Sequence, residues 1–412
     1  MSAAAETSFP KEKIKILLLE GVNQSALDTF EAAGYTNIDY HTKALGEDEL
    51  IDTIKDAHLV GIRSKTQLSE KVIAGAERLL GIGAFCIGTN QIDLEAAMAR
   101  GIAAFNSPYS NTRSVAELVI AESIMLIRRI PERDAAAKKG DWLKDARGSY
   151  ELRGKTLGII GYGHIGSQVS VLAEALGLKV IYHDVIPKLP LGNAEQAGSL
   201  DDLLKRADIV TLHVPDTPET RGMMTAEKLG LMKEGSILLN LSRGSVVDID
   251  ALRDKLESGH ISGAGIDVYP KEPKAKGEQF VSPLQGLSNV ILTPHIGGST
   301  VEAQVNIGID TATKLINWLD NGSTVGSHTV PELNLPVQQN TNRLLHIHHN
   351  QPGVLSEINN RISSLGINIV GQYLKTNESI GYVVLDTEKA AAEELITAMR
   401  EIKHTIRARI LY

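Results

Sequence analysis

The segment GYGHIG at 161–166 contains three glycines at the spacing G-x-G-x-x-G, directly after the apolar run 156–160. Between a strand and a helix, the first glycine allows a tight turn and the second lets a pyrophosphate approach the backbone. The third lets the helix pack against the strand. N–H groups at the start of such a helix have no partner within the helix and can bind phosphate oxygens. The residues that we expect at this site are Gly161, Gly163, His164, Ile165 and Gly166.

An acidic residue, Asp184, ends the next expected strand, 179–184. A carboxylate at this place can accept hydrogen bonds from the ribose hydroxyls of a dinucleotide, and it would repel a 2′-phosphate. The combination of glycine loop and acid therefore predicts NAD rather than NADP as the cofactor. The alternative is a structural glycine turn followed by a surface aspartate.

Three further polar residues, Arg243, Glu272 and His295, each follow a segment that we expect to be a strand of the same sheet. Ligands of open α/β sheets bind beyond the carboxyl ends of the strands, so these side chains could meet at the nicotinamide. Each residue alone has an ordinary explanation: a surface ion pair for the arginine, a solvated glutamate, and a capped loop for the histidine.

Two groups of apolar strands alternate with helical patterns, which is typical of βαβ units and doubly wound parallel sheets. The first group comprises 14–20, 37–41, 58–64, 81–86 and 103–107; the second comprises 156–160, 179–184, 208–214, 236–242, 262–268 and 289–294. A long amphipathic segment after His295 would return to the first group. We therefore expect a Rossmann NAD-binding domain over 110–296 and a discontinuous, flavodoxin-like substrate-binding domain of residues 1–109 and 297–335.

One long helix is expected from Ser114 to Arg129, with Ser114 as its N-cap and Glu117 completing a capping box. Pro131 would mark its end, and residues 132–154 should be rich in loops. The tail follows a different pattern of strand, helix, two strands, helix and strand, which predicts a ferredoxin-like βαββαβ domain over 340–412.

The composition excludes several classes of protein. Lys and Arg number 42 against 50 Asp and Glu, giving a formal net charge of −8, and 42% of residues are hydrophobic. These values argue against a disordered chain and against general nucleic-acid binding. The only cysteine, Cys86, excludes an intrachain disulfide, and we expect no metal. Without a signal-like or membrane-spanning segment, a cytoplasmic protein is expected.

Several longer motifs carry a family resemblance. LHVPDTPETRGMM at 212–224, MKEGSILLNLSRGSVVD at 232–248, GAGIDVYPKEP at 263–273 and LTPHIGGST at 292–300 resemble the D-isomer-specific 2-hydroxyacid dehydrogenases. The resemblance implies an NAD-dependent oxidoreductase in which His295 is the acid/base, Glu272 orients its ring, and Arg243 grips the substrate carboxylate. It places Asp267 at the nicotinamide carboxamide. The other residues implied around the nicotinamide are Leu241, Ser242, Arg243, His295, Ile296, Gly297 and Gly298.

The cations Arg63 and Lys65 could determine which 2-hydroxy acid the protein binds. Arg63-Ser64-Lys65 follows a strand of the first group, and two cations around a hydroxyl suit a distal phosphate or carboxylate. A solvated loop is the alternative. Asn111 is a further candidate in the substrate site, and Lys144 and Lys43 are candidates from a neighbouring subunit.

The whole chain resembles the bacterial-type members of this family that oxidise 3-phospho-D-glycerate in the first step of serine synthesis. The detailed matches lie in segments 83–102 and 106–120. Such relatives also reduce 2-oxoglutarate. Lys65 stands where arginine is expected, and a lysine lacks the fork geometry of the guanidinium.

The tail resembles an ACT domain in segment 346–359, which implies L-serine as effector at His348, Asn350 and Asn368. A homotetramer is the implied assembly, with the last strand as an edge that could pair with a partner.

Three alternatives remain at this stage. Another D-2-hydroxyacid dehydrogenase, acting on lactate or glyoxylate, would not need the Arg63 and Lys65 cations or the ACT tail. A non-catalytic, NAD-sensing regulator could keep the Arg243, Glu272 and His295 trio. A pure amino-acid-binding regulator would have a vestigial dehydrogenase half.

Overall fold

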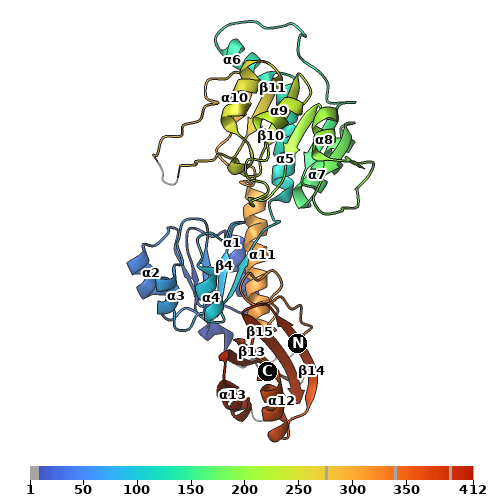
Figure 1. Ribbon diagram of the computed structural model, residues 1–412. Helices are drawn as coiled ribbons and strands as arrows, with labels where there is room; N and C mark the ends of the chain where they lie inside the picture. Colours follow the sequence, from blue (N-terminus) through green and yellow to red (C-terminus); the bar gives the residue numbers. More distant parts are fainter. Residues whose placement is uncertain (1–8, 274–276, 338–340, 389–391, 412) are drawn as a thin grey trace. The chain divides into compact units, whose positions relative to one another are not determined.

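A computed structural model of the chain describes residues 9–273, 277–337, 341–388 and 392–411. Its contacts divide it into two compact units (Figure 1). Unit 1 comprises Met1–Ser110 and Gln304–Tyr412, and unit 2 comprises Asn111–Ala303.

The first sheet of unit 1 is parallel and has the strand order β2-β1-β3-β4-β5, the flavodoxin-like order. Its strands are β1 (Ile16–Leu18), β2 (Ile38–Tyr40), β3 (Leu59–Ile62), β4 (Gly81–Ala84) and β5 (Ala103–Asn106). Its helices are α1 (Gln24–Ala32), α2 (Glu47–Ile54), α3 (Glu70–Gly75), α4 (Leu94–Ala99) and the long α11 (Val301–Asp320). The middle strands are apolar on both faces because separate buried clusters cover each face.

The sheet of unit 2 has seven parallel strands in the order β12-β11-β10-β9-β6-β7-β8. They are β6 (Thr156–Ile160), β7 (Lys179–His183), β8 (Glu195–Gln196), β9 (Ile209–Leu212), β10 (Ser236–Asn240), β11 (Ile261–Ile266) and β12 (Val290–Leu292). Its helices are α5 (Thr112–Ile127), α6 (Ile130–Lys138), α7 (His164–Ala175), α8 (Leu200–Arg206), α9 (Ala226–Leu231) and α10 (Ile249–Glu257). The order reverses beside β6, which is the switch point where doubly wound sheets bind ligands. The short edge strand β8 was not predicted, since two residues carry no period.

The C-terminal part of unit 1 is an antiparallel sheet of order β14-β15-β13-β16 with two helices on one face. Its elements are β13 (Thr341–His349), α12 (Val354–Ser364), β14 (Ile369–Thr376), β15 (Ile380–Glu388), α13 (Ala392–Arg400) and β16 (Thr405–Leu411). The predicted βαββαβ arrangement is confirmed, as is the fold class of two doubly wound parallel sheets followed by a ferredoxin-like domain.

The other face of this antiparallel sheet is buried within unit 1. Leu345, Ile347 and Tyr382 from the sheet share one hydrophobic cluster with Trp318 of α11 and Phe105 of β5. Hydrogen bonds tie the same surfaces together: the Tyr382 hydroxyl donates to Gly322 O at 2.6 Å, and Arg407 Nη1 donates to Leu79 O at 2.7 Å. The tail is therefore packed against the first sheet and is not merely tethered to it.

Two sequence expectations about the long helix are wrong. Helix α5 begins at Thr112, after Asn111, and the hydroxyl of Ser114 forms a hydrogen bond with that of Thr300 at 2.7 Å, so Ser114 is not an N-cap. Pro131 lies in the first turn of a new helix, α6, which begins at Ile130, because a proline in the first turn removes no intrahelical hydrogen bond. Part of the segment 132–154 is therefore helical.

Across the described ranges, no helix combines the length and apolarity that crossing a lipid bilayer requires.

Candidate active site

The glycine loop of unit 2 has the geometry that a dinucleotide requires. Gly161 has φ +91°, and a Cβ on it would lie 2.3 Å from His213 O. A Cβ on Gly166 would lie 2.2 Å from Gly161 O, so this glycine lets α7 approach the end of β6. Gly163, the residue before α7, faces open space, with nothing within 4 Å of an added Cβ. This open space beside the helix N-terminus fits a pyrophosphate.

Asp184 lies directly after β7 and faces the same loop. Its Oδ2 accepts a hydrogen bond from Tyr162 N at 2.8 Å, and its Oδ1 accepts one from Ile186 N at 2.9 Å. These two bonds orient the carboxylate beside the glycine loop. Each oxygen keeps a further lone pair, so the carboxylate can still accept bonds from ribose hydroxyls.

His295 and Glu272 form a pair at the carboxyl ends of β12 and β11. His295 Nδ1 lies 2.9 Å from Glu272 Oε2, and Glu272 Oε1 accepts a hydrogen bond from Tyr269 N at 3.1 Å. The glutamate thereby orients the ring through one nitrogen. The His295 side chain is 53% exposed, so an incoming molecule can reach it. Its φ of +55° is left-handed, a conformation in which histidine is enriched among non-glycine residues.

Arg243 follows β10 in a loop that Asn240 shapes. Asn240 Nδ2 donates to Arg243 O at 3.0 Å, and Asn240 Oδ1 accepts from the backbone N–H of Ser242 at 3.1 Å. The next residue, Gly244, lies so close to the 269–270 backbone that a Cβ would be 2.0 Å from the carbonyl carbon of Tyr269. This approach brings the Arg243 loop against the segment that leads to Glu272. Leu241 and Ser242 are buried in the same loop.

Asp267 holds the loop that carries His295. Its Oδ1 accepts from Thr293 Oγ1 at 2.6 Å and from Ile296 N at 2.8 Å, and its Oδ2 accepts from Gly297 N at 2.8 Å. The carboxylate is 1% exposed. The sequence did not indicate this anchoring role, because the bonds join residues about 30 positions apart.

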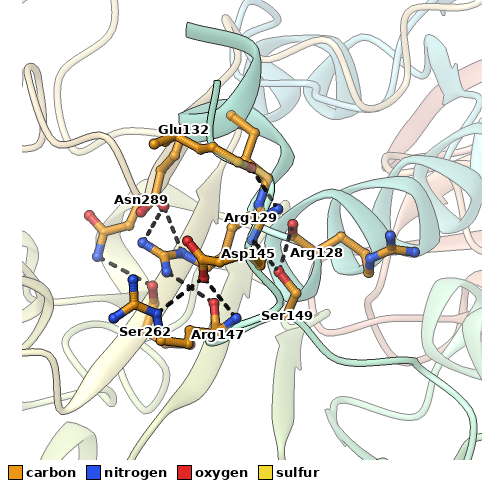
Figure 2. A network of polar contacts seen from close by, with 10 residues as sticks. Arg128, Arg129, Glu132, Asp145, Arg147, Ser149, Ser262 and Asn289 are labelled. Carbon is orange, nitrogen blue, oxygen red and sulfur yellow. Dashed lines mark hydrogen bonds and ion pairs between the residues drawn. The ribbon is translucent and has the colours of Figure 1, made fainter. Parts of the chain in front are cut away.

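Asn111 and Lys144 have different surroundings within unit 2. Asn111 is buried and packs on Gly298, where a Cβ would lie 2.1 Å from Asn111 Nδ2. Lys144 is exposed in the loop after α6. Arg133 donates to the carbonyls on both sides of it, Leu143 O at 3.1 Å and Asp145 O at 2.7 Å. Figure 2 shows the surrounding network, in which Arg129, Asp145 and Ser149 also take part.

The remaining candidates lie in unit 1. Arg63, Ser64 and Lys65 follow β3; Ser64 and Lys65 are exposed and Arg63 is half-buried. Lys43 is exposed in the loop after β2.

The three predicted effector residues lie in the C-terminal domain. His348 is 4% exposed, and its Nδ1 lies 3.4 Å from His346 Nδ1. Asn350 and Asn368 are exposed; Asn350 Nδ2 donates to Asn377 O at 2.9 Å, and Asn368 Nδ2 donates to Glu388 Oε1 at 3.2 Å. Burial, and then the charge of His349, lowers the pKa of His348. Burial, and then the charge of His348, lowers the pKa of His346 to about 4.

Sequence reasoning missed a buried acid behind the active site. Glu122 of α5 is 1% exposed, and neither of its carboxylate oxygens has a hydrogen-bond partner among the described residues. Gly265 makes room for it, since a Cβ there would lie 2.3 Å from Glu122 Oε2. Burial, and then the charge of Asp267, raises the pKa of Glu122 to about 8. A neutral Glu122 avoids a second negative charge beside Asp267.

We expect Glu122 to make stability depend on pH. Because the folded pKa lies above the unfolded value, unfolding releases a proton, and the unfolding free energy should fall as pH rises from about 4.5 to 8. The loss should be on the order of 3 to 5 kcal/mol. Glu122→Gln should remove this slope in urea unfolding at pH 5 to 8. The control is Glu117→Gln on the same helix, at a side chain that is 60% exposed. Parallel wild-type and Glu122→Gln curves would contradict the assignment.

Comparison with known proteins agrees with this geometry. Residues 120–297 match the NAD-binding domain of the D-isomer specific 2-hydroxyacid dehydrogenases, and residues 344–407 match the AHAS small subunit-like ACT domain. D-3-phosphoglycerate dehydrogenase of Haemophilus influenzae is 54% identical over 407 residues, covering 99% of each chain. That of Escherichia coli K12 is 55% identical over 410 residues, covering 99% of this chain and 100% of the relative. The structure of Aquifex aeolicus D-lactate dehydrogenase with NAD and lactic acid is 29% identical, with TM-score 0.64, over 77% of this chain and all of that one.

Identity of this extent along the full length, together with a glycine loop and Asp184 that suit NAD, decides the family. The chain is an NAD-dependent oxidoreductase that belongs to the D-isomer specific 2-hydroxyacid dehydrogenases with a C-terminal ACT domain.

Proposed function

We propose that this enzyme interconverts 3-phospho-D-glycerate and 3-phosphohydroxypyruvate, the first step of L-serine synthesis. The observation that carries the proposal is full-length identity of 54% and 55% to relatives named D-3-phosphoglycerate dehydrogenase. Cations at Arg63 and Lys65, suited to a distal anion, support it further. 2-Oxoglutarate, which also has a distal anion, is proposed as a second substrate for reduction.

NAD, held along the glycine loop of residues 161–166, would supply the hydride acceptor for C2 of the hydroxy acid, and NADH the hydride donor in the reverse direction. His295 takes the hydroxyl proton during oxidation and returns it to the carbonyl oxygen during reduction, since imidazole can serve both directions near neutral pH. Glu272, 2.9 Å from Nδ1, keeps the other ring nitrogen available to the substrate and stabilises the imidazolium. Arg243 binds the substrate carboxylate and polarises the C2 oxygen.

The other residues have supporting roles in this proposal. Asp267 binds the hydroxyl of Thr293 before His295 and the backbone N–H of Ile296 after it, and is proposed to hold the nicotinamide carboxamide. Arg63, Ser64 and Lys65 bind the distal phosphate, Asn111 contributes to the substrate site, and Lys43 and Lys144 assist from a neighbouring subunit. We propose a homotetramer in the cytoplasm, with the three domains in substrate-binding, NAD-binding and regulatory roles.

A substrate panel followed by NADH absorbance tests the reaction. We expect 3-phosphohydroxypyruvate to have the highest kcat/KM, followed by 2-oxoglutarate, with pyruvate and glyoxylate far behind. A preference for pyruvate or glyoxylate would make the enzyme a dehydrogenase of another 2-hydroxy acid. No turnover of any member of the panel would favour an NAD-sensing regulator.

L-Serine is proposed as the inhibitor that binds the ACT domain. His348→Ala and Asn350→Ala should each shift the half-inhibitory serine concentration upward by at least about tenfold, since each removes a polar contact to the effector. NADH binding and the uninhibited rate should stay unchanged. A control is Asn359→Ala on α12 of the same domain. An unaltered serine response in both variants would remove these residues from the effector site.

A further inference from the structure

Glu20 has a backbone conformation that a glutamate rarely adopts. It follows β1 at the carboxyl end of the strand and has φ +63°, next to Gly21 at φ +62°. For an L-residue, the left-handed region costs roughly 1–2 kcal/mol. Such outliers persist where the surroundings compensate for them, and they gather at functional sites.

The side chain of Glu20 compensates through three hydrogen bonds to one loop. Oε1 accepts from Thr66 N at 2.8 Å and from Arg63 N at 3.1 Å, and Oε2 accepts from Lys65 N at 3.0 Å. Its own N–H donates to Lys43 O at 3.1 Å. One residue therefore ties together the backbones of the two loops that carry Arg63, Lys65 and Lys43.

Neutral groups complete the support of Arg63. Gln91, which is 7% exposed, donates from Nε2 to Arg63 O at 2.7 Å. Arg63 Nη2 donates to Gln304 Oε1 at 3.0 Å. These contacts orient the arginine without neutralising its guanidinium.

Among the described residues, Glu20 and the cations Arg63, Lys65 and Lys43 do not form ion pairs with one another. Although Glu20 lies between the two loops, its carboxylate binds backbone N–H groups. It forms no ion pair with any cation in the ranges that the structure describes. In the described part of the chain, Arg63, Lys65 and Lys43 all lack a carboxylate within 4.0 Å of their side-chain nitrogens. The backbone N–H groups of Arg63, Lys65 and Thr66 are thus occupied by Glu20, while the side-chain cations stay available for an anion.

We propose that Glu20 is a positioning residue for the distal anion of the substrate. It holds the 63–66 loop in one conformation, so that Arg63 and Lys65 meet the anion without first ordering the loop. This inference rests on the proposed function, because it assumes a substrate with a distal phosphate or carboxylate. Such prior ordering lowers the entropy that binding would otherwise cost.

We expect substitution of Glu20 to lower kcat/KM only for substrates that carry a distal anion. Glu20→Gln keeps the length of the side chain, but its amide N–H₂ cannot accept from Lys65 N, so the loop is released at one point. We expect kcat/KM for 3-phosphohydroxypyruvate and for 2-oxoglutarate to fall about 10- to 100-fold, the scale of a displacement near 1 Å. For hydroxypyruvate, which lacks the distal anion, the change should stay below about twofold.

Three further variants separate positioning from a general loss of structure. Glu20→Asp keeps the charge but withdraws the carboxylate by one methylene, and it should show the same selective loss. Glu31→Gln, at an exposed glutamate of α1, is the matched control and should change nothing. In an Arg63→Gln background, the selective effect of Glu20→Gln should largely disappear, because Glu20 acts through the arginine loop.

The outcomes distinguish the two proposals. If the wild type prefers hydroxypyruvate to both anionic substrates, the proposed function and this inference fall together. If the wild type prefers the phosphorylated acid, and Glu20→Gln lowers kcat/KM equally for all substrates, only the assignment of Glu20 is overturned. An undiminished effect of Glu20→Gln in the Arg63→Gln background would also overturn it.

Discussion

His295→Asn is expected to lower kcat by about 10²- to 10⁴-fold, the usual contribution of a positioned acid or base. Asparagine tolerates the left-handed backbone, so the φ of +55° at this position can be kept while the imidazole is lost. Binding of NADH, measured by its fluorescence, should change far less than kcat, because the glycine loop and Asp184 are untouched.

Two further variants make this expectation specific. Glu272→Gln should lower kcat less than His295→Asn, because the amide oxygen can still accept from Nδ1–H but cannot stabilise an imidazolium. It should also alter the pH profile of kcat. His260→Ala is the control, because His260 precedes β11 at the amino end of the strand. A His295→Asn enzyme with more than about a tenth of wild-type kcat would rule out the acid/base role.

Arg343→Met is expected to destabilise the C-terminal domain by about 3–5 kcal/mol, the cost of leaving one member of a buried ion pair without its partner. Arg343 binds Asp386 through two hydrogen bonds, Nε to Oδ1 at 2.6 Å and Nη2 to Oδ2 at 2.8 Å. The side chains are 5% and 1% exposed. Arg343 Nη1 also donates to Asn321 O and to Pro336 O, so the arginine connects β13 to the segments after α11.

Urea unfolding followed by the fluorescence of Trp318, which lies beside Tyr382 of this domain, measures the effect. The double variant Arg343→Met/Asp386→Leu should recover much of the loss, since it leaves no unpaired buried charge. The matched control is Arg361→Met, which breaks a pair with Glu401 whose side chains are 40% and 62% exposed, and it should cost less than about 1 kcal/mol. Equal losses in the two single variants would show that burial of the pair is unimportant.

Local features of the chain were sufficient for much of the fold. All strands except β8, the glycine loop and the βαββαβ tail were predictable, because short apolar runs and glycine spacings are patterns of a few neighbouring residues. The first turn of α5 could not be predicted in this way, since the hydroxyl of Ser114 forms a hydrogen bond with Thr300 and does not cap the helix. A capping pattern in the sequence does not say whether a distant partner competes for the hydroxyl.

The sequence by itself determined which chemical groups are present: the glycine loop, Asp184, and the Arg243, Glu272 and His295 trio. Only the tertiary structure decided how the supporting acids are used. Asp267 binds the His295 loop and Glu20 binds the Arg63 loop, whereas the carboxylate of Glu122 is buried with no hydrogen-bond partner among the described residues. The physical reason is that a carboxylate acts through the few ångströms around it, and those neighbours come from segments far away along the chain.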